Sequence, residues 1–324
     1  MKKVFITRKL PDEFISPLKQ IAEVEMWESE DITCPRNILL EKVKDADALL
    51  SMLSDKIDED VFSVSKQLKV VANLAVGFDN IDVKQATKHN VAVCNTPDVL
   101  TESTADLTFA LLMATARRVV EAAQYIKEGK WTGWSPFLLA GTDIHHKTIG
   151  IVGMGKIGEA VARRAKGFNM NILYHNRSRK MDAEKELRAV YCSFEEILQK
   201  SDFIVCLTPL TEYTRNLFDK EAFEKMKPSA IFINASRGAV VDEEALLNAL
   251  KNGEIKAAGL DVFQIEPIDE NHPLLDLDNV VALPHIGSAS IETRQNMIKL
   301  CVDNILLVLN GEKPKTLVNT EWLK

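Results

Sequence analysis

The 324-residue chain contains no apolar run of about 18 residues, so no membrane-spanning helix is expected. The apolar segment within residues 1–8 is short and soon interrupted by a charged residue, unlike a signal peptide. There is also no basic block, and the formal net charge of −7 argues against nucleic acid as a partner. These absences direct attention to small-molecule ligands.

Paired disulfide or metal ligands are missing as well. The five cysteines are scattered, without a C-x-x-C pair, and are predicted to be buried, reduced thiols of a cytoplasmic protein. The six histidines show no metal-ligand spacing, and the adjacent His145 and His146 are predicted to lie in a loop. No metal site is therefore expected.

An alternation of apolar segments is what the chain does contain. Its length and its apolar content of 46% suit about two domains with ordinary cores. Residues 1–100 predict a helix at 35–44 and strands at 4–7, 48–51, 68–75 and 91–94. Strands separated by helical segments indicate a parallel sheet with helices on both faces, which is an α/β fold.

The most informative motif lies near the middle of the chain. A β-branched strand at 148–152 runs into Gly153, Gly155 and Gly158, and a helical segment follows at 159–166. In this G-x-G-x-x-G spacing the first glycine permits the turn, the second lets a pyrophosphate approach, and the third lets helix and strand pack closely. The motif predicts a dinucleotide site; the alternative is a glycine-rich turn without a ligand.

The segments after the motif predict a doubly wound sheet of about six strands. Helices are expected at 194–199 and at 243–251, the latter closed by Gly253, and further strands at 171–175, 203–207, 230–234, 257–260 and 280–283. Ahead of the motif, residues 101–120 predict one long apolar helix with Thr101 as its N-cap, buried at a domain junction or a subunit interface.

Two further segments carry expectations about packing. Residues 127–146 are loop-like, and their Trp131 and Trp134 are expected to be packing anchors rather than ligand contacts. Residues 290–309 predict a long amphipathic helix. This helix could cross back to the first domain and make that domain discontinuous.

The residues after the second strand of the nucleotide unit bear on the choice of cofactor. NAD sites usually place an acidic residue there to bind the ribose hydroxyls. This chain has Asn176, 18 residues beyond Gly158, followed by Arg177, Ser178 and Arg179. An amide, a hydroxyl and two guanidinium groups can receive a 2′-phosphate, so NADP(H) is preferred and NAD(H) stays possible. A solvated basic turn is the simpler alternative.

Loops after three successive strands each carry one side chain suited to chemistry: Arg237, Glu266 and His285. Because parallel strands end at one edge, the three can converge near the nicotinamide. A histidine can deliver a proton, a glutamate beside it favours imidazolium, and an arginine can hold and polarise a 2-oxo acid. The set predicts hydride transfer to a 2-oxo acid. Ser236 is discounted as a nucleophile because no G-x-S-x-G motif surrounds it.

Six short segments form a recognisable set: 75–82 (AVGFDNID), 153–158 (GMGKIG), 207–211 (LTPLT), 234–242 (NASRGAVVD), 260–267 (LDVFQIEP) and 283–287 (LPHIG). With them the chain resembles, from end to end, the D-isomer-specific 2-hydroxyacid dehydrogenase family. Within that family, residues 134–141 and the Asn-Arg-Ser-Arg turn resemble the glyoxylate/hydroxypyruvate reductases and the related 2-ketogluconate reductases.

The resemblance implies two doubly wound domains and a homodimer joined through the nucleotide-binding domains. A flavodoxin-like substrate domain would comprise residues 1–100 plus 288–324, with the discontinuous C-terminal helix, and a Rossmann nucleotide-binding domain would comprise residues 101–287.

The resemblance also implies roles for individual residues. His285 would be the proton donor, Glu266 its partner and Arg237 the substrate clamp, while backbone N–H groups of Val76 and Gly77 would bind the substrate carboxylate. The cofactor would contact Thr104, Gly153, Met154, Gly155, Lys156, Ile157, Gly158, Asn176, Arg177, Ser178, Arg179, Thr208, Pro209, Ala235, Ser236, Asp261 and Gly287.

Glyoxylate or hydroxypyruvate is the first expectation for the substrate, reduced to a D-2-hydroxy acid. The alternative within the class is a 2-ketogluconate reductase with a roomier pocket near Leu53 and Trp134. An alternative from another class is a non-catalytic NAD(P)-sensing binding protein, against which the complete Arg/Glu/His set argues.

Overall fold

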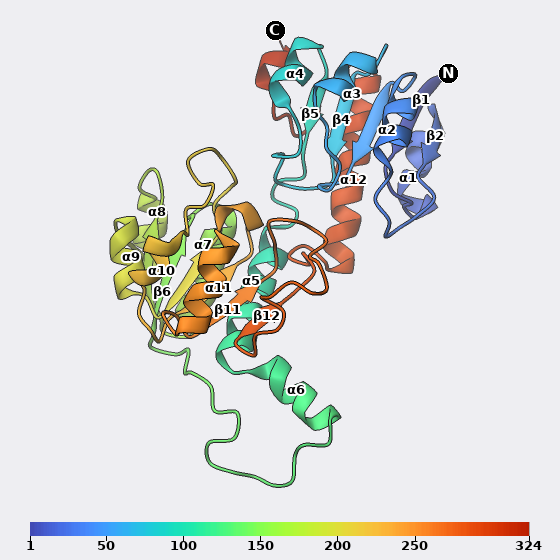
Figure 1. Ribbon diagram of the computed structural model, residues 1–324. Helices are drawn as coiled ribbons and strands as arrows, with labels where there is room; N and C mark the ends of the chain where they lie inside the picture. Colours follow the sequence, from blue (N-terminus) through green and yellow to red (C-terminus); the bar gives the residue numbers. More distant parts are fainter. Residues whose placement is uncertain (324) are drawn as a thin grey trace. The chain divides into compact units, whose positions relative to one another are not determined.

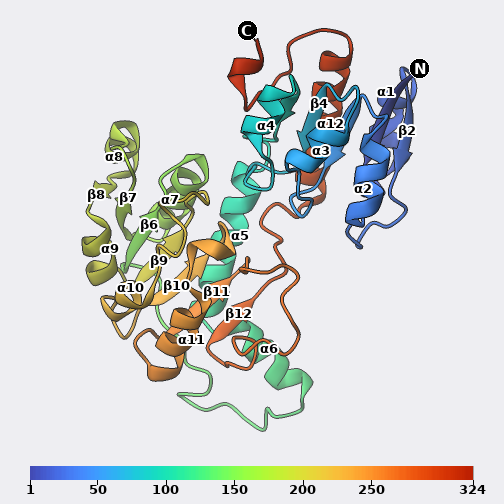
Figure 2. The same ribbon diagram turned by 45° about the horizontal axis from the view of Figure 1, so that its top comes forward.

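A computed structural model describes residues 1–323, and the contacts divide them into two compact units. Unit 1 comprises Met1–Leu100 and the described residues from Ala289 onward, and unit 2 comprises Thr101–Ser288. Each unit is built on a parallel sheet with helices around it, which confirms the predicted α/β class (Figures 1 and 2). The assignment of unit 1 to the substrate and of unit 2 to the cofactor stays a prediction.

Unit 1 contains a five-stranded parallel sheet in the order β2-β1-β3-β4-β5. Its strands are β1 (Lys2–Ile6), β2 (Ala22–Met26), β3 (Ala48–Ser51), β4 (Val70–Asn73) and β5 (Ala92–Cys94). Its helices are α1 (Asp12–Lys19), α2 (Arg36–Val43), α3 (Glu59–Val64), α4 (Val83–Lys88) and α12 (Ile291–Leu309), and a short 3-10 turn spans Thr320–Leu323.

Strand β2 was not expected, and its place in the sheet explains why. It lies at an edge, where one row of side chains faces solvent, so the buried Ala22 and half-buried Val24 alternate with exposed glutamates. In contrast, β3, β4 and β5 are buried along their whole length and read as continuous apolar runs. Buried strands therefore stood out in the sequence and the edge strand did not.

Helix α12 returns the chain to unit 1. Its buried side chains include Met297, Cys301, Ile305 and Val308, which recur at helical spacing on one face. Within unit 1 this helix packs against β3, β4, β5 and α1. Ser290 caps it by accepting a hydrogen bond from the Thr293 N–H at 3.2 Å. The amphipathic helix expected at 290–309 is thus confirmed, and so is its packing on the first part of the chain.

Unit 2 contains a seven-stranded parallel sheet in the order β12-β11-β10-β9-β6-β7-β8. Its strands are β6 (Thr148–Val152), β7 (Asn171–His175), β8 (Val190–Tyr191), β9 (Phe203–Cys206), β10 (Ile231–Asn234), β11 (Ala257–Leu260) and β12 (Val280–Ala282). Its helices are α5 (Thr101–Ala116), α6 (Val119–Lys127), α7 (Lys156–Gly167), α8 (Met181–Leu187), α9 (Phe194–Lys200), α10 (Lys220–Glu224) and α11 (Glu243–Asn252), with a 3-10 turn at Gly238–Val240.

Most predicted strands of unit 2 are confirmed, and the count of six was one too low. The additional strand, β8, has only two residues at the edge of the sheet, too few to show a pattern. Helix α11 ends as expected at Gly253, which adopts a left-handed φ of 71°.

The single helix predicted at 101–120 is wrong, because the chain forms two helices there. Arg118 adopts a left-handed φ of 52°, which ends α5 and starts α6 in a new direction. Its guanidinium group stabilises the break through hydrogen bonds of 2.8 and 2.7 Å to Glu121. Thr101 is the first residue of α5 rather than its N-cap. Burial holds for α5, whereas α6 has no buried residue.

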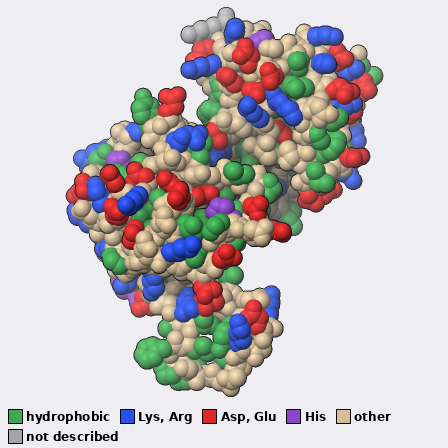
Figure 3. Space-filling model, viewed as in Figure 1, with side chains coloured by type: hydrophobic (Ala, Val, Ile, Leu, Met, Phe, Trp, Pro, Cys, Tyr) green, Lys and Arg blue, Asp and Glu red, His purple; other side chains and the backbone are tan. Residues whose placement is uncertain are grey.

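The prediction that the two tryptophans are packing anchors is also wrong for the chain as described. Helix α6 and the loop that follows it in the sequence project from the sheet of unit 2 in both ribbon views. In this projection, which we call the arm (residues 119–140), Trp131 is 58% exposed, Trp134 82% and Phe137 86%. Figure 3 shows apolar side chains gathered over the same part of the molecule. Large apolar groups in water need another explanation.

The remaining composition-based expectations concern cysteines, membranes and metals. All five cysteines are buried and unpaired, as predicted. No helix among residues 1–323 is long and apolar enough to cross a membrane. The described residues likewise hold no group of three His, Cys, Asp or Glu side chains that could bind a metal ion.

The segment after α12 runs along β5, and Asn319 ties it there. Val318 donates its N–H to the Val93 carbonyl at 2.8 Å. The buried Asn319 side chain accepts from the Val93 N–H at 2.8 Å and donates to the Val91 carbonyl at 2.9 Å. One side chain therefore satisfies two backbone groups of an edge strand.

We expect Asn319→Ala to lower the free energy of unfolding by about 1–3 kcal/mol, because it leaves buried backbone groups without partners. Urea denaturation followed by circular dichroism measures this. The control is Asn37→Ala on α2, an exposed position where the change should stay within about 0.5 kcal/mol. Equal effects from the two variants would contradict the prediction.

Candidate active site

The glycine turn after β6 has the geometry that the motif predicts. Gly153 has a φ of +105°, and a Cβ there would lie 2.6 Å from the Leu207 carbonyl carbon. A Cβ on Gly158 would lie 2.4 Å from the Gly153 oxygen, so helix and turn touch closely. A Cβ added to Gly155 would meet no atom within 4 Å beyond its chain neighbours. This open space beside the N-terminus of α7 fits the pyrophosphate of a dinucleotide, whose charge the helix N–H groups favour.

The turn also lies where an open sheet is expected to bind a ligand. Strand β6 pairs with β7 on one side and β9 on the other, so the strand order reverses beside β6. Thr208 and Pro209 follow β9 at the same edge. Behind them the Cys206 thiol lies 3.2 Å from the Ser236 hydroxyl and 3.7 Å from the Thr208 hydroxyl. The predicted cofactor residues after β9 and β10, Ala235 among them, thus share this edge.

Other predicted cofactor residues are placed by close packing. A Cβ on Gly287 would lie 3.1 Å from Asp261 Oδ2 and 3.4 Å from Thr104 Cγ2, so these three residues meet. The Met154 side chain is fully buried in the core of unit 2, so only its backbone can face a ligand. Lys156 and Ile157 begin helix α7.

The turn after β7 holds its two arginines differently. The Arg179 guanidinium makes two hydrogen bonds to Glu184, at 3.0 and 2.5 Å. This pair, with a hydrogen bond from Tyr174, lowers the pKa of Glu184 to about 2. Arg177 is exposed and makes no ion pair with any residue from 1 to 323. Within residues 1–323 the Asn176 amide donates only to the Ser178 carbonyl, at 3.3 Å. Arg177 is therefore the guanidinium free to meet a phosphate.

The predicted histidine and glutamate lie in contact. His285 Nδ1 is 2.7 Å from Glu266 Oε2, and Glu266 Oε1 accepts a hydrogen bond from the Phe263 N–H at 3.0 Å. Burial alone would raise the pKa of Glu266. The hydrogen bond and charge of His285, with smaller contributions from the Phe263 N–H and from Arg237, outweigh burial and hold the pKa of Glu266 below its usual value. Glu266 is thus a stable anionic partner for a histidine.

Asp261 fixes the loop that carries the histidine. Its buried carboxylate accepts hydrogen bonds from the Ile286 N–H at 2.7 Å and the Gly287 N–H at 2.8 Å. His285 itself has a left-handed φ of 53°, a conformation that needs such support. The family resemblance placed Asp261 beside the cofactor; the structure adds that it holds the histidine loop.

Arg237 is brought to the same edge by the glycine that follows it. A Cβ on Gly238 would lie 1.8 Å from the Phe263 carbonyl carbon, so only glycine allows the two loops to touch. The Arg237 carbonyl accepts a hydrogen bond from the Asn234 side-chain amide at 3.0 Å. Nη1 of the Arg237 guanidinium donates to the Ser236 carbonyl at 2.8 Å. The Ser236 hydroxyl donates to Asn234 at 2.8 Å. Unit 2 thus gathers Arg237, Glu266 and His285 at one edge.

The two remaining predicted residues belong to unit 1. Val76 and Gly77 lie half-buried in the loop after β4. That the N–H groups of Val76 and Gly77 donate to the substrate carboxylate stays a prediction.

Comparison with known proteins gives a consistent result. Residues 109–287 match the family described as D-isomer specific 2-hydroxyacid dehydrogenase, NAD binding domain. The glyoxylate reductase of Pyrococcus furiosus is 52% identical, over 99% of this chain and 96% of its own length. The glyoxylate reductase of Korarchaeum cryptofilum is 50% identical, over 99% of this chain and 97% of its own length.

Solved structures extend the likeness to the whole fold. A protein from Thermus thermophilus superposes with a TM-score of 0.92 at 44% identity, covering 98% of this chain and 99% of that one. The NADPH-dependent glyoxylate/hydroxypyruvate reductase of Sinorhizobium meliloti, in complex with NADP and malonate, gives a TM-score of 0.86 at 32% identity, covering 99% and 97%. These likenesses set aside the non-catalytic alternative. The chain therefore belongs to the D-isomer-specific 2-hydroxyacid dehydrogenase family, as an enzyme that reduces 2-oxo acids with a nicotinamide dinucleotide.

Proposed function

We propose that this enzyme reduces glyoxylate and hydroxypyruvate with NADPH, giving a product of D configuration where the product is chiral. The observation that carries the proposal is the His285–Glu266 pair, 2.7 Å apart, at the ligand-binding edge of the nucleotide sheet. The relatives named glyoxylate reductase, at about half identity over the full chain, support the choice of substrate.

The pair suits proton delivery to a carbonyl oxygen. With Nδ1 of His285 donating to Glu266, the Nε2–H of the imidazolium is the proton that can be transferred. Glu266 stays anionic, so its carboxylate accepts the Nδ1–H of His285 and holds the ring in place for the transfer. The His285 side chain is 24% exposed, which lets solvent return the proton after each turnover. The nicotinamide supplies the hydride when it is bound.

Arg237 has the charge and shape to hold the substrate. Its planar fork can bind a carboxylate or carbonyl oxygen and polarise the carbonyl group. The turn at Gly238 and the Asn234 amide fix its backbone, so the side chain starts from a defined place. Backbone N–H groups of Val76 and Gly77 are proposed to bind the substrate carboxylate.

The preference for NADPH rests on the turn after β7. It offers the exposed Arg177, the Ser178 hydroxyl and the Asn176 amide, with no carboxylate at the ribose position to repel a phosphate. Arg179 is engaged with Glu184, so we assign the phosphate contact to Arg177 first. The S. meliloti relative, described as NADPH-dependent, is consistent with this assignment.

We expect His285→Gln to reduce kcat on the order of 10²–10⁴-fold, the usual effect of removing a general acid. Glu266→Gln should cost less, because the amide keeps the shape of the side chain and removes only the anionic acceptor that orients the His285 ring. Steady-state rates across pH, with NADPH affinity from fluorescence, measure both effects. Activity of His285→Gln within a few-fold of wild type would refute the proton-donor role.

We expect kcat/KM with NADPH to exceed that with NADH, and glyoxylate and hydroxypyruvate to be reduced faster than 2-ketogluconate. A panel of 2-oxo acids assayed with both cofactors tests this directly.

Arg177→Ala should lower kcat/KM for NADPH about tenfold by removing a charge-assisted hydrogen bond, and should leave kcat/KM for NADH unchanged. Lys185→Ala, an exposed cation on α8, is the matched control. Equal or better use of NADH by wild type would overturn the cofactor assignment, and faster 2-ketogluconate reduction would favour the alternative substrate.

The exposed arm supports a homodimer formed through unit 2. A cavity of about 750 Å³ lies beside it, lined by α6, the Leu275–Asn279 loop and β12. Monomeric proteins rarely expose large contiguous apolar patches, and the arm exposes Trp131, Trp134 and Phe137 together. We propose that the arm packs on a second copy of this chain.

We expect wild type to be dimeric in sedimentation velocity experiments, and the double variant Trp134→Asp, Phe137→Asp to be monomeric, because two charges would have to be buried. Tyr213→Asp changes a side chain of unit 2 that is 90% exposed outside the arm and should stay dimeric. A monomeric wild type would refute the proposed interface.

A further inference from the structure

The loop after β4 has an unusual arrangement of held carbonyl groups. The Ala75 carbonyl accepts from the Thr96 N–H at 2.9 Å, and the Val76 carbonyl accepts from the Asn95 side-chain amide at 2.8 Å. The Gly77 carbonyl accepts from the Asn73 side-chain amide at 3.0 Å. Three successive peptide oxygens are therefore fixed by donors outside the loop.

Fixing a carbonyl also fixes the N–H of the same peptide. A trans peptide is planar, so its N–H points opposite to its C=O. Thr96 and Asn95 are neighbours in the segment after β5, so the N–H groups of Val76 and Gly77 both face away from that segment. Neither N–H donates to any residue from 1 to 323. Half-buried, oriented and unpaired N–H groups are suited to an anion.

We propose that Asn95 is the positioning residue of the carboxylate-binding loop, with Asn73 supporting it from the other side. Both side-chain amides act on the substrate only through the peptide planes of residues 75–78. This inference rests on the proposed role of Val76 and Gly77 as donors to the substrate carboxylate. It assigns specificity for 2-oxo acids partly to side chains that never touch them.

The C-terminal part of the chain braces Asn95. The Asn95 carbonyl accepts from the Thr316 hydroxyl at 2.7 Å. Thr316 is held by the fully buried Asn304 of α12, whose amide donates to the same hydroxyl at 2.8 Å and whose oxygen accepts from the Lys315 N–H at 2.8 Å. The return of the chain to unit 1 thus supports the loop as well as covering the sheet.

A second brace holds Asn73. Its side-chain oxygen accepts from the Ser51 hydroxyl at 3.1 Å, and its amide also donates to Asn80 at 3.1 Å. The Asn80 amide in turn donates to the Met52 and Asp55 carbonyls at 3.1 and 2.9 Å. Asn73 therefore depends on the turn formed by residues 52–55.

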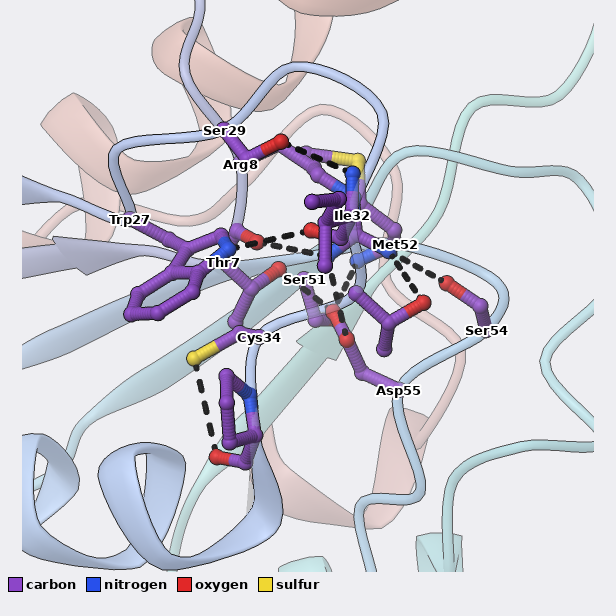
Figure 4. A network of polar contacts seen from close by, with 12 residues as sticks. Thr7, Arg8, Trp27, Ser29, Ile32, Cys34, Ser51, Met52, Ser54 and Asp55 are labelled. Atoms are coloured by element: carbon purple, nitrogen blue, oxygen red, sulfur yellow. Dashed lines mark hydrogen bonds and ion pairs between the residues drawn. The ribbon is translucent and has the colours of Figure 1, made fainter.

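That turn is anchored by a buried ionic network (Figure 4). The Asp55 carboxylate accepts hydrogen bonds from the Met52 N–H at 2.7 Å and from the Thr7 hydroxyl, and Arg8 Nη1 lies 3.8 Å away. Asp55 and Arg8 are both buried. Burial raises the pKa of Asp55, although these partners oppose the shift. The network lies after β1 and β3, where the strand order of unit 1 reverses.

In an open α/β sheet that place usually holds a ligand. Here the chain's own Arg8 and Asp55 are buried there instead, and Arg8 also donates hydrogen bonds to the hydroxyls of Ser54 and Thr33, at 3.0 and 2.9 Å. The reversal point of unit 1 has become a support for the turn, and through Asn80 and Asn73 for the carboxylate-binding loop.

The test replaces the donor without changing the shape of the side chain. In Asn95→Asp an oxygen faces the Val76 carbonyl, so that peptide plane is no longer held. We expect KM for glyoxylate and the inhibition constant of oxamate, an unreactive 2-oxo acid isostere, to rise about tenfold. NADPH affinity and kcat should stay within a few-fold of wild type. Asn73→Asp should act in the same direction.

Asn319→Asp is the control for a purely structural effect. Asn319 is also a buried amide bonded to β5 backbone, but it contacts the start of that strand, away from residues 75–78. It should lower the melting temperature and leave KM and oxamate inhibition unchanged. Asn95→Ala and Asn73→Asp keep the test possible if Asn95→Asp does not fold.

Two outcomes would overturn the inference: unchanged KM and oxamate inhibition in the folded variants, or a parallel rise in KM for NADPH. A wild-type enzyme that reduces no 2-oxo acid would instead refute the proposed function, so the two failures are distinguishable. A rise confined to the carboxylate substrate and to oxamate supports the positioning role.

Discussion

Parallel strand pairing is the constraint on which both units depend. It places the carboxyl ends of all strands in a sheet at one edge, so short loops far apart in sequence meet there. In unit 2 this edge gathers the glycine turn after β6 with Arg237, Glu266 and His285. In unit 1 the same edge gathers Arg8, Asp55 and the loop at Val76. In unit 2 the place where the strand order reverses is open to a ligand, whereas in unit 1 the corresponding place is occupied by the buried Arg8 and Asp55.

Strand pairing alone brings the loops near each other, and close backbone contacts make the arrangement accurate. Gly238 lets the arginine loop touch the backbone at Phe263, which itself donates to Glu266. Asp261 holds the two peptides after His285. A proton donor must stay within hydrogen-bonding reach of its target, so these contacts matter as much as the reacting groups. None of them requires a side chain that itself touches substrate.

Local patterns in the sequence were sufficient for the buried parallel strands and for the glycine turn. Strands 148–152 and 171–175 occur at the expected residues because apolar runs and glycine spacing are short-range signals. The break at Arg118 escaped prediction because an arginine in a left-handed conformation has no distinctive sequence signal. The exposure of Trp134 is equally invisible to composition, since an apolar residue reads as core wherever it will be covered. Thr316 contacts Asn95, more than two hundred residues earlier in the sequence, and Asn304 in the preceding helix α12. No local sequence motif indicates contacts of this kind.

The discontinuous build of unit 1 acquires a physical reason from these contacts. An apolar helix on the open face of a sheet could come from any part of the chain, because burial is not directional. Hydrogen bonds are directional, and the chain after α12 supplies three that matter: Thr316 to Asn95, Val318 to Val93, and Asn319 to Val91. Val318 and Asn319 hold the chain against β5 and stabilise the unit, whereas Thr316 fixes Asn95 itself, which in turn fixes the peptide before Gly77. A loop that must present backbone N–H groups to a small anion has few atoms with which to hold itself, so its rigidity has to come from neighbouring segments.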